Sequence, residues 1–242
     1  MDVAGLIERR SIPARDDVSE VIWWVLRGTA AGAIAGFVVG GIGGRLAMLL
    51  LRLTSDDIVL GLTSDDGFEI GVISAQTFAL LLLTTVLGAV NGLLYAVLRT
   101  AIPGRLRLPL WTGVGALVGG SLFVHDEGVD FTLITPALLA IALFVLLPGV
   151  AAALVVLLVE RWDREAAWRN RRFTVLVVAA SIGSTFALAP AALVAGAAFL
   201  VRRAGARERL LRVGRILAPI GIAALGAVAG FDLVSESNRI LR

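Results

Sequence analysis

The chain contains no cysteine, no lysine and a single histidine in 242 residues. Without cysteine it can form neither a disulfide nor a thiolate metal site. With one histidine it cannot build a zinc site of the His-x-x-x-His type, and no Gly-x-Ser-x-Gly elbow or phosphate-binding loop occurs. We therefore expect a protein that is not an enzyme and that holds no metal and no cofactor.

Charge is also scarce, because only 17% of the residues are charged whereas 58% are hydrophobic, and the mean hydropathy is +0.90. A water-soluble chain of this length could not bury so much apolar surface. Six uncharged segments approach or exceed the roughly 20 residues that cross a hydrocarbon core. They are Gly28–Gly44 (lengthened by Val21–Leu26), Gly71–Leu98, Leu108–Val124, Phe131–Val159, Phe173–Val201 and Ile216–Phe231.

These segments predict an all-α fold, a polytopic transmembrane helical bundle of about six helices. Residues 21–235 form the single transmembrane domain. A short cytoplasmic N-terminal tail (1–20) precedes it and a short C-terminal tail (236–242) follows. The N-terminal tail lacks the basic-then-apolar pattern of a signal peptide, so we expect the first span to be retained.

The placement of arginine predicts the orientation of the bundle. Arginines gather in the N-terminal tail and in the second and fourth loops, whereas the first and third loops are acidic. This pattern indicates a multi-pass protein of the bacterial inner (plasma) membrane with a cytoplasmic N-terminus. We expect the Arg-rich loops to contact anionic lipid headgroups. Because the basic residues lie in short loops and not along one soluble face, we expect no nucleic-acid binding.

The fifth loop is basic although six simple spans would place it outside the cell. Two topologies remain open for the segment before it, Phe173–Val201. It is either one long, proline-kinked span or a re-entrant hairpin that enters and leaves on the same side. We prefer the single span, because a hairpin would leave only about 14 residues for each leg.

A stripe of glycines at four-residue spacing runs along the first apolar segment. In a bilayer such a stripe lets a second backbone approach closely. We interpret it as a seam between helices of one subunit, and the alternative is a homo-oligomer whose subunits pack through it. Its members are Gly28, Gly32, Gly36, Gly40 and Gly44, and the pairs Gly88/Gly92, Gly115/Gly119 and Gly226/Gly230 repeat the spacing.

Seven ionisable residues are candidates for ion pairs or for function. Arg27 and Arg45 flank the glycine stripe and Asp232 ends the last apolar segment, and charge inside a membrane is costly and usually paired. Asp232 would reach Arg27 in a six-span protein and Arg45 if the fifth segment is a hairpin. The other candidates lie in the outer loops: Asp66, His125, Asp126 and Asp130. The sequence leaves two roles open for them, as turn-forming residues or as ligands of a cation.

Two further polar features lie in or beside apolar segments. Asn91 predicts an interhelical hydrogen bond. The stretch Glu160–Arg172 combines two tryptophans with five arginines, which predicts an interfacial helix on anionic headgroups.

Short motifs resemble a group of uncharacterised actinobacterial multi-pass membrane proteins. They are Gly43-Gly44-Arg45-Leu46-x-Met48, Thr54-Ser55-x-Asp57, Asp66-Gly67-Phe68-x-Ile70-Gly71, and Asp126-Glu127-Gly128-x-Asp130-Phe131 with Pro136. The likeness covers about half the chain. It implies a six-helix membrane protein and brings no activity and no functional residues.

Two functions are compatible with these observations. We prefer a non-enzymatic structural or accessory membrane protein that acts through helix packing or partner binding, because ionisable residues in the spans are few and lie near helix ends. The alternative is a small transporter or channel with a pathway near Arg45, Arg27 and Asp232. A continuous wet cavity that reaches Arg45 or Asp232 would favour the alternative.

Overall fold

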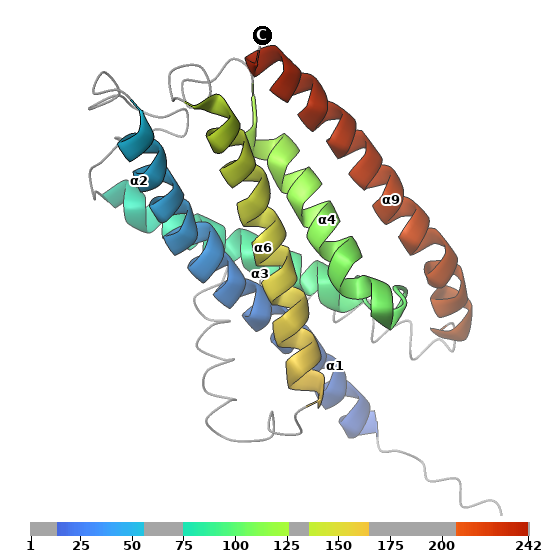
Figure 1. Cartoon of the computed structure of the whole chain (residues 1–242). Coiled ribbons are helices and arrows are strands. Elements are labelled where there is room, and N and C mark those ends of the chain that lie inside the picture. The colour runs from blue at the N-terminus through green and yellow to red at the C-terminus, as the bar shows by residue number, and fades with distance from the viewer. Residues whose placement is uncertain (1–13, 56–74, 126–135, 165–206, 242) are drawn as a thin grey trace, which may run out of the picture.

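A computed structural model describes residues 14–55, 75–125, 136–164 and 207–241 (Figure 1). The helices are α1 (Ala14–Ala35), η2 (Gly36–Gly43), α2 (Gly44–Thr54), α3 (Ala75–Leu98), α4 (Gly104–Phe123), α6 (Ala137–Arg164) and α9 (Arg207–Ile240). These ranges contain no strand, so the predicted all-α fold is confirmed. The predicted fifth segment, Phe173–Val201, lies outside the described residues.

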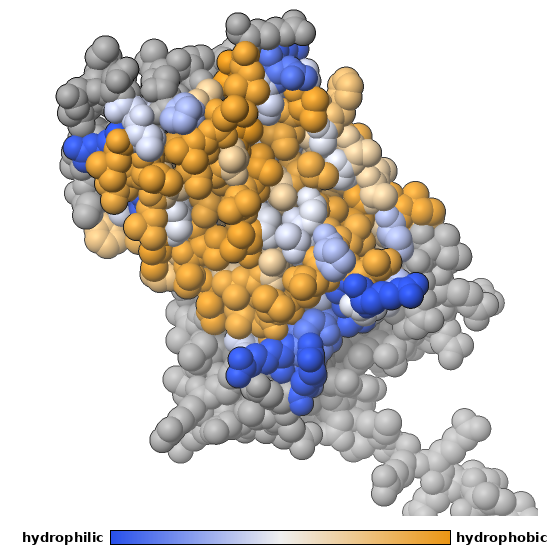
Figure 2. Space-filling view, viewed as in Figure 1, coloured by the Kyte–Doolittle hydropathy of each residue, from blue (hydrophilic) through white to orange (hydrophobic). Residues whose placement is uncertain are grey.

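Five helical stretches are long and apolar enough to cross a membrane: Trp23–Thr54, Thr77–Leu98, Gly104–Phe123, Ala137–Arg164 and Leu217–Ile240. Figure 2 shows the corresponding surface, a broad apolar band with hydrophilic residues toward its two ends. Two bounds differ from those expected. Helix α1 already begins at Ala14 and α9 continues to Ile240, so part of each predicted tail is helical.

The first span is one continuous rod that consists of α1, η2 and α2. The middle part, η2, is π-helical, with hydrogen bonds that reach one residue further than in an α-helix. At its end the N–H of Gly44 lies within reach of the carbonyl oxygens of Val39, Gly40 and Gly41. The sequence had predicted an uninterrupted α-helical stripe in this region, and the wider turns change the direction in which its last glycines face.

Helices α1 and α3 pack backbone to backbone through glycine. A Cβ atom at Gly28 would lie 2.8 Å from the carbonyl oxygen of Gly92, and one at Gly92 would lie 2.7 Å from Cα of Gly32. One at Gly88 would lie 2.6 Å from Cα of Gly36. No real Cβ fits at such distances, so glycine is required for this approach.

The glycines in the later part of the stripe do not make this close backbone contact. A Cβ at Gly40 would meet the Thr84 side chain at 3.0 Å, and one at Gly44 would meet nothing within 4 Å. The close contact with α3 therefore uses Gly28, Gly32 and Gly36 and stays within one chain.

Helices α4 and α6 form a second close pair. A Cβ at Gly115 would lie 2.5 Å from Cβ of Ala152, and one at Gly119 would lie 2.5 Å from Cγ of Pro148. Pro148 lies inside α6, and its ring fills the space that Gly119 leaves. By contrast, a Cβ at Gly226 or Gly230 of α9 would lie 3.6–3.8 Å from the Leu117 side chain, which is ordinary van der Waals contact.

The described helices alternate in direction along the chain, α9 included. We call the two ends of the bundle the Arg164 end, where α6 finishes, and the Thr54 end, where α2 finishes. Helix α3 runs antiparallel to α1, and α6 runs antiparallel to α4, as the paired glycines show. Helix α9 runs parallel to α4, since Gly226 lies beside Val114 and Leu233 beside Gly120 (Figure 1).

The direction of α9 distinguishes the two topologies left open by the sequence. Helix α9 begins at the Arg164 end, where α6 finishes, and ends at the Thr54 end. A single crossing between them would have placed the start of α9 at the opposite end. The preferred six-span arrangement is therefore not the one that these helices adopt, and the re-entrant alternative agrees with their directions.

Because the chain has no cysteine, single cysteines can report this topology directly. We expect Asn238→Cys to react with a membrane-impermeant thiol reagent from the same side as His125→Cys, because both positions are exposed and lie at the Thr54 end. Thr100→Cys, exposed at the Arg164 end, should react only from the other side. Labelling in intact and in lysed cells measures the difference. Reaction of Asn238→Cys together with Thr100→Cys would restore the six-span topology.

Candidate functional site

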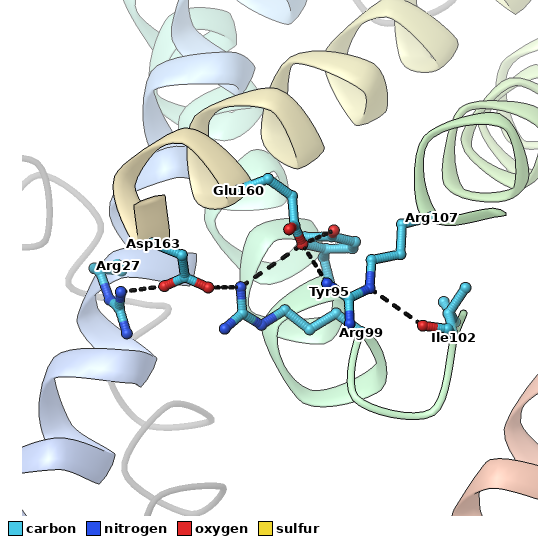
Figure 3. A network of polar contacts seen from close by, with 7 residues as sticks. All are labelled: Arg27, Tyr95, Arg99, Ile102, Arg107, Glu160 and Asp163. Atoms are coloured by element: carbon cyan, nitrogen blue, oxygen red, sulfur yellow. Dashed lines mark hydrogen bonds and ion pairs between the residues drawn. The ribbon is translucent and has the colours of Figure 1, made fainter. Parts of the chain in front are cut away.

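A polar network at the Arg164 end joins four helices (Figure 3). Its two carboxylates, Glu160 and Asp163, lie near the end of α6, three residues apart and hence on one helix face. Three arginines approach them: Arg27 from α1, Arg99 from the turn after α3, and Arg107 from α4. The charged residues of the network therefore all lie at the Arg164 end of the bundle.

Asp163 connects α6 to the α1–α3 pair. Its Oδ1 accepts a hydrogen bond from Nη1 of Arg27, and its Oδ2 pairs with Nη1 of Arg99. The side chains of Arg27 and Arg99 are only 12% and 13% exposed. Because so little water reaches these guanidinium groups, their charge must be stabilised by a carboxylate of the protein.

Glu160 connects α6 to α3 and α4. Its Oε1 accepts hydrogen bonds from the hydroxyl of Tyr95 at 2.8 Å and from Nη1 of Arg107 at 2.9 Å, and Nη1 of Arg99 lies 3.7 Å away. Arg107 also donates through Nε to the backbone carbonyl of Ile102 at 3.2 Å. This second bond fixes the turn between α3 and α4 against the end of α6.

A buried aromatic pair supports the network from inside the bundle. Tyr95 is fully buried, and its ring centroid lies 5.3 Å from that of Trp111. The indole N–H of Trp111 donates to Oδ1 of Asn91 at 3.1 Å, which confirms the predicted interhelical hydrogen bond of Asn91. These contacts lock the orientation of Tyr95, so its hydroxyl is directed at Glu160.

Chemically, this arrangement is a set of paired charges. Both carboxylates face arginines and not each other, and Glu160 already accepts hydrogen bonds from two donors. Within the described ranges no group of three His, Cys, Asp or Glu side chains could hold a metal ion. The network is therefore suited to holding four helices in a fixed arrangement.

The structure assigns Arg27 a partner that the sequence did not suggest. The six-span topology predicted that Asp232 would lie within reach of Arg27 or the second loop, and the pairing of Asp232 with Arg27 is wrong. Arg27 pairs with Asp163, whereas Asp232 is exposed on α9 near the Thr54 end. The expectation failed because it depended on the direction of the last helix.

The other candidates lie at the Thr54 end or outside the described residues. Arg45 is half-buried and donates through Nη2 to Oγ1 of Thr77 at the start of α3. His125 is exposed just after α4. The candidates outside the described ranges are Asp66, Asp126 and Asp130.

Sequence reasoning missed Tyr95, Arg99, Arg107, Glu160 and Asp163 as one cluster. Glu160 and Asp163 were assigned to an interfacial helix, but α6 continues as a single helix through Arg164, so they belong to its last turns. One signal was available, since these acids follow a long apolar run and lie in a loop otherwise rich in arginine. An isolated acid in such a place indicates a cation to be neutralised.

Comparison with protein-family models, with curated proteins and with solved structures finds no match for this chain. Any functional conclusion therefore depends on the chain's own geometry.

Proposed function

We propose that this chain is a multi-pass protein of the bacterial inner membrane that acts as a non-enzymatic structural or accessory component, through helix packing or partner binding. One observation carries the proposal. Arg27, a candidate pathway charge, is held by Asp163 in a network that ties four helices together. The other two pathway candidates, Arg45 and Asp232, lie toward the opposite end, on different helices. The three charges do not converge on one route across the bundle.

The proposed orientation places the Arg164 end in the cytoplasm. Arg105, Arg161 and Arg164 are exposed there, in addition to the arginines of the network. Cytoplasmic loops of membrane proteins carry an excess of arginine and lysine. We infer that the exposed guanidinium groups contact anionic lipid headgroups, which is the interaction such clusters make at membrane surfaces.

Access of water to the interior of the bundle distinguishes this function from that of a transporter or channel. Ala89 and Val155 are fully buried at α3 and α6. We expect Ala89→Cys and Val155→Cys to resist a small hydrophilic thiol reagent applied from either side, because no water would reach them in a packed scaffold. Labelling of unfolded samples controls for the presence of the thiol, and Thr100→Cys serves as the reactive reference.

The opposite labelling result would favour the alternative function. Rapid reaction of either buried cysteine, with the fold intact by gel filtration, would indicate a wet pathway between the helices. Such a result would contradict the accessory role and support a small transporter or channel.

A further inference from the structure

The outward face of α9 is apolar and uncovered by the other described helices. Helix α9 packs on α4 through the side containing Ile222, Gly226, Ala229 and Leu233. Its opposite side exposes large apolar side chains over about two and a half turns. These are Leu225 (53% exposed), Val228 (70%), Phe231 (80%) and Val234 (60%).

A carboxylate lies on the flank of this apolar face. Asp232 is exposed, and no ion pair or hydrogen bond to it occurs in the part of the chain that the structure describes. The residue lies inside a stretch long and apolar enough to cross a membrane, Leu217–Ile240. An ionised carboxylate at such a place is costly when it faces lipid, and it is stabilised by a cation.

Helix α2 presents a matching face at the opposite edge of the bundle (Figure 1). Four leucines are exposed along it: Leu46, Leu49, Leu50 and Leu53. Arg52 lies on the flank of this face, is half-buried and has no ion pair or hydrogen bond among the described residues. Each of the two faces therefore combines apolar side chains with one charge, and the charges are opposite.

The two charges lie in the same half of the bundle. Leu51 of α2 and Leu233 of α9 belong to one buried cluster with Val124 and Ala140. Arg52 follows Leu51 directly, and Asp232 directly precedes Leu233. Both charges therefore lie in the half of the bundle nearer the Thr54 end.

We propose that the α9 face of one copy of this chain docks on the α2 face of a second copy, with Asp232 of the first opposite Arg52 of the second. The proposal uses the multi-pass topology of the proposed function, in which all copies share one orientation. In that case, residues at equal depth in the membrane face each other between neighbouring copies. Two α9 faces packed together would instead bring two Asp232 carboxylates near each other, which is unfavourable. The contact is head-to-tail, so it forms either a closed ring or an open row.

Cysteine cross-linking between differently tagged copies tests this contact. Leu49 and Phe231 lie on the two exposed apolar faces, each two residues before a member of the shared buried cluster, so we expect Leu49→Cys and Phe231→Cys to form an intermolecular disulfide in oxidised membranes. Neither variant should cross-link to itself. Leu217→Cys is the matched control, because it is exposed on α9 but lies at the other end of the helix.

A charge exchange tests the role of the two charges. Asp232→Arg in the copy that carries Phe231→Cys should abolish the Leu49–Phe231 cross-link, and Arg52→Asp in the copy that carries Leu49→Cys should restore it. A Phe231–Phe231 disulfide, a cross-link to a protein of different mass, or no cross-link at all would overturn the proposal. The side from which Asn238→Cys reacts is measured separately, so a wrong topology can be distinguished from a wrong interface.

Discussion

Replacing Gly32 with alanine is expected to destabilise the bundle strongly. The added Cβ would lie 2.8 Å from both the carbonyl carbon of Gly88 and the backbone nitrogen of Gly92, and it would meet the Gly88 carbonyl oxygen. All three atoms belong to backbone, so no side-chain rotation relieves the clash. Overpacking typically costs about 1–3 kcal/mol, and a backbone clash belongs at the upper end of that range.

Thermal unfolding in detergent measures this effect. We expect the midpoint for Gly32→Ala to fall by roughly 5 °C or more, from the usual relation between stability and midpoint for a chain of this size. Gly44→Ala is the matched control, because a Cβ there meets nothing within 4 Å. It should be neutral or stabilising by up to about 1 kcal/mol, since alanine favours helix over glycine. Equal midpoints for the two variants would show that α1 and α3 do not pack as described.

Replacing Asp163 with alanine is expected to have a comparable or larger effect. The change removes the carboxylate shared by Arg27 and Arg99, whose side chains are 12% and 13% exposed. The Asp163 side chain is 26% exposed, so we expect a loss between that of a surface pair, up to about 1 kcal/mol, and that of a buried pair that loses one partner, about 3–5 kcal/mol. Here two charges lose their carboxylate, although Arg99 keeps Glu160 at 3.7 Å.

A double-mutant cycle separates the charge effect from lost packing. If the pairing matters, Arg27→Met combined with Asp163→Ala should lose less stability than the two single losses added together. Arg164→Ala is the control, since Arg164 is exposed one residue further along α6, and a surface change of this kind stays within about 0.5 kcal/mol. If the stability losses of the two single variants add up to that of the double variant, the Arg27–Asp163 pair does not stabilise the bundle.

Composition and spacing were sufficient to predict the helical membrane fold and the positions of several spans. The glycine spacing also identified residues that require a close neighbour. It could not identify which neighbour, because four helices carry the same spacing and only Gly88 and Gly92 face Gly28, Gly32 and Gly36. Spacing describes one helix, whereas packing depends on how two helices are placed.

The polar network could not be predicted in the same way. Arg27 and Asp163 are separated by 136 residues, and Tyr95 and Glu160 by 65. The pairing depends on which ends of α1, α3, α4 and α6 meet, and hence on the direction of each helix. Because the six-span topology placed Asp232 at the wrong end of the bundle, it also predicted the wrong partner for Arg27.

The π-helical segment η2 determines how the two halves of the first span face their surroundings. Each α-helical residue turns the chain by about 100°, so the extra residue that π-helical turns accommodate acts as a phase shift between α1 and α2. Deleting one residue between Gly36 and Gly43 would rotate α2 by about that angle relative to α1. Arg45 would then turn away from Thr77, and the leucine face of α2 would turn toward different neighbours. Eight residues without a polar side chain thereby set the direction in which both arginines of α2 point.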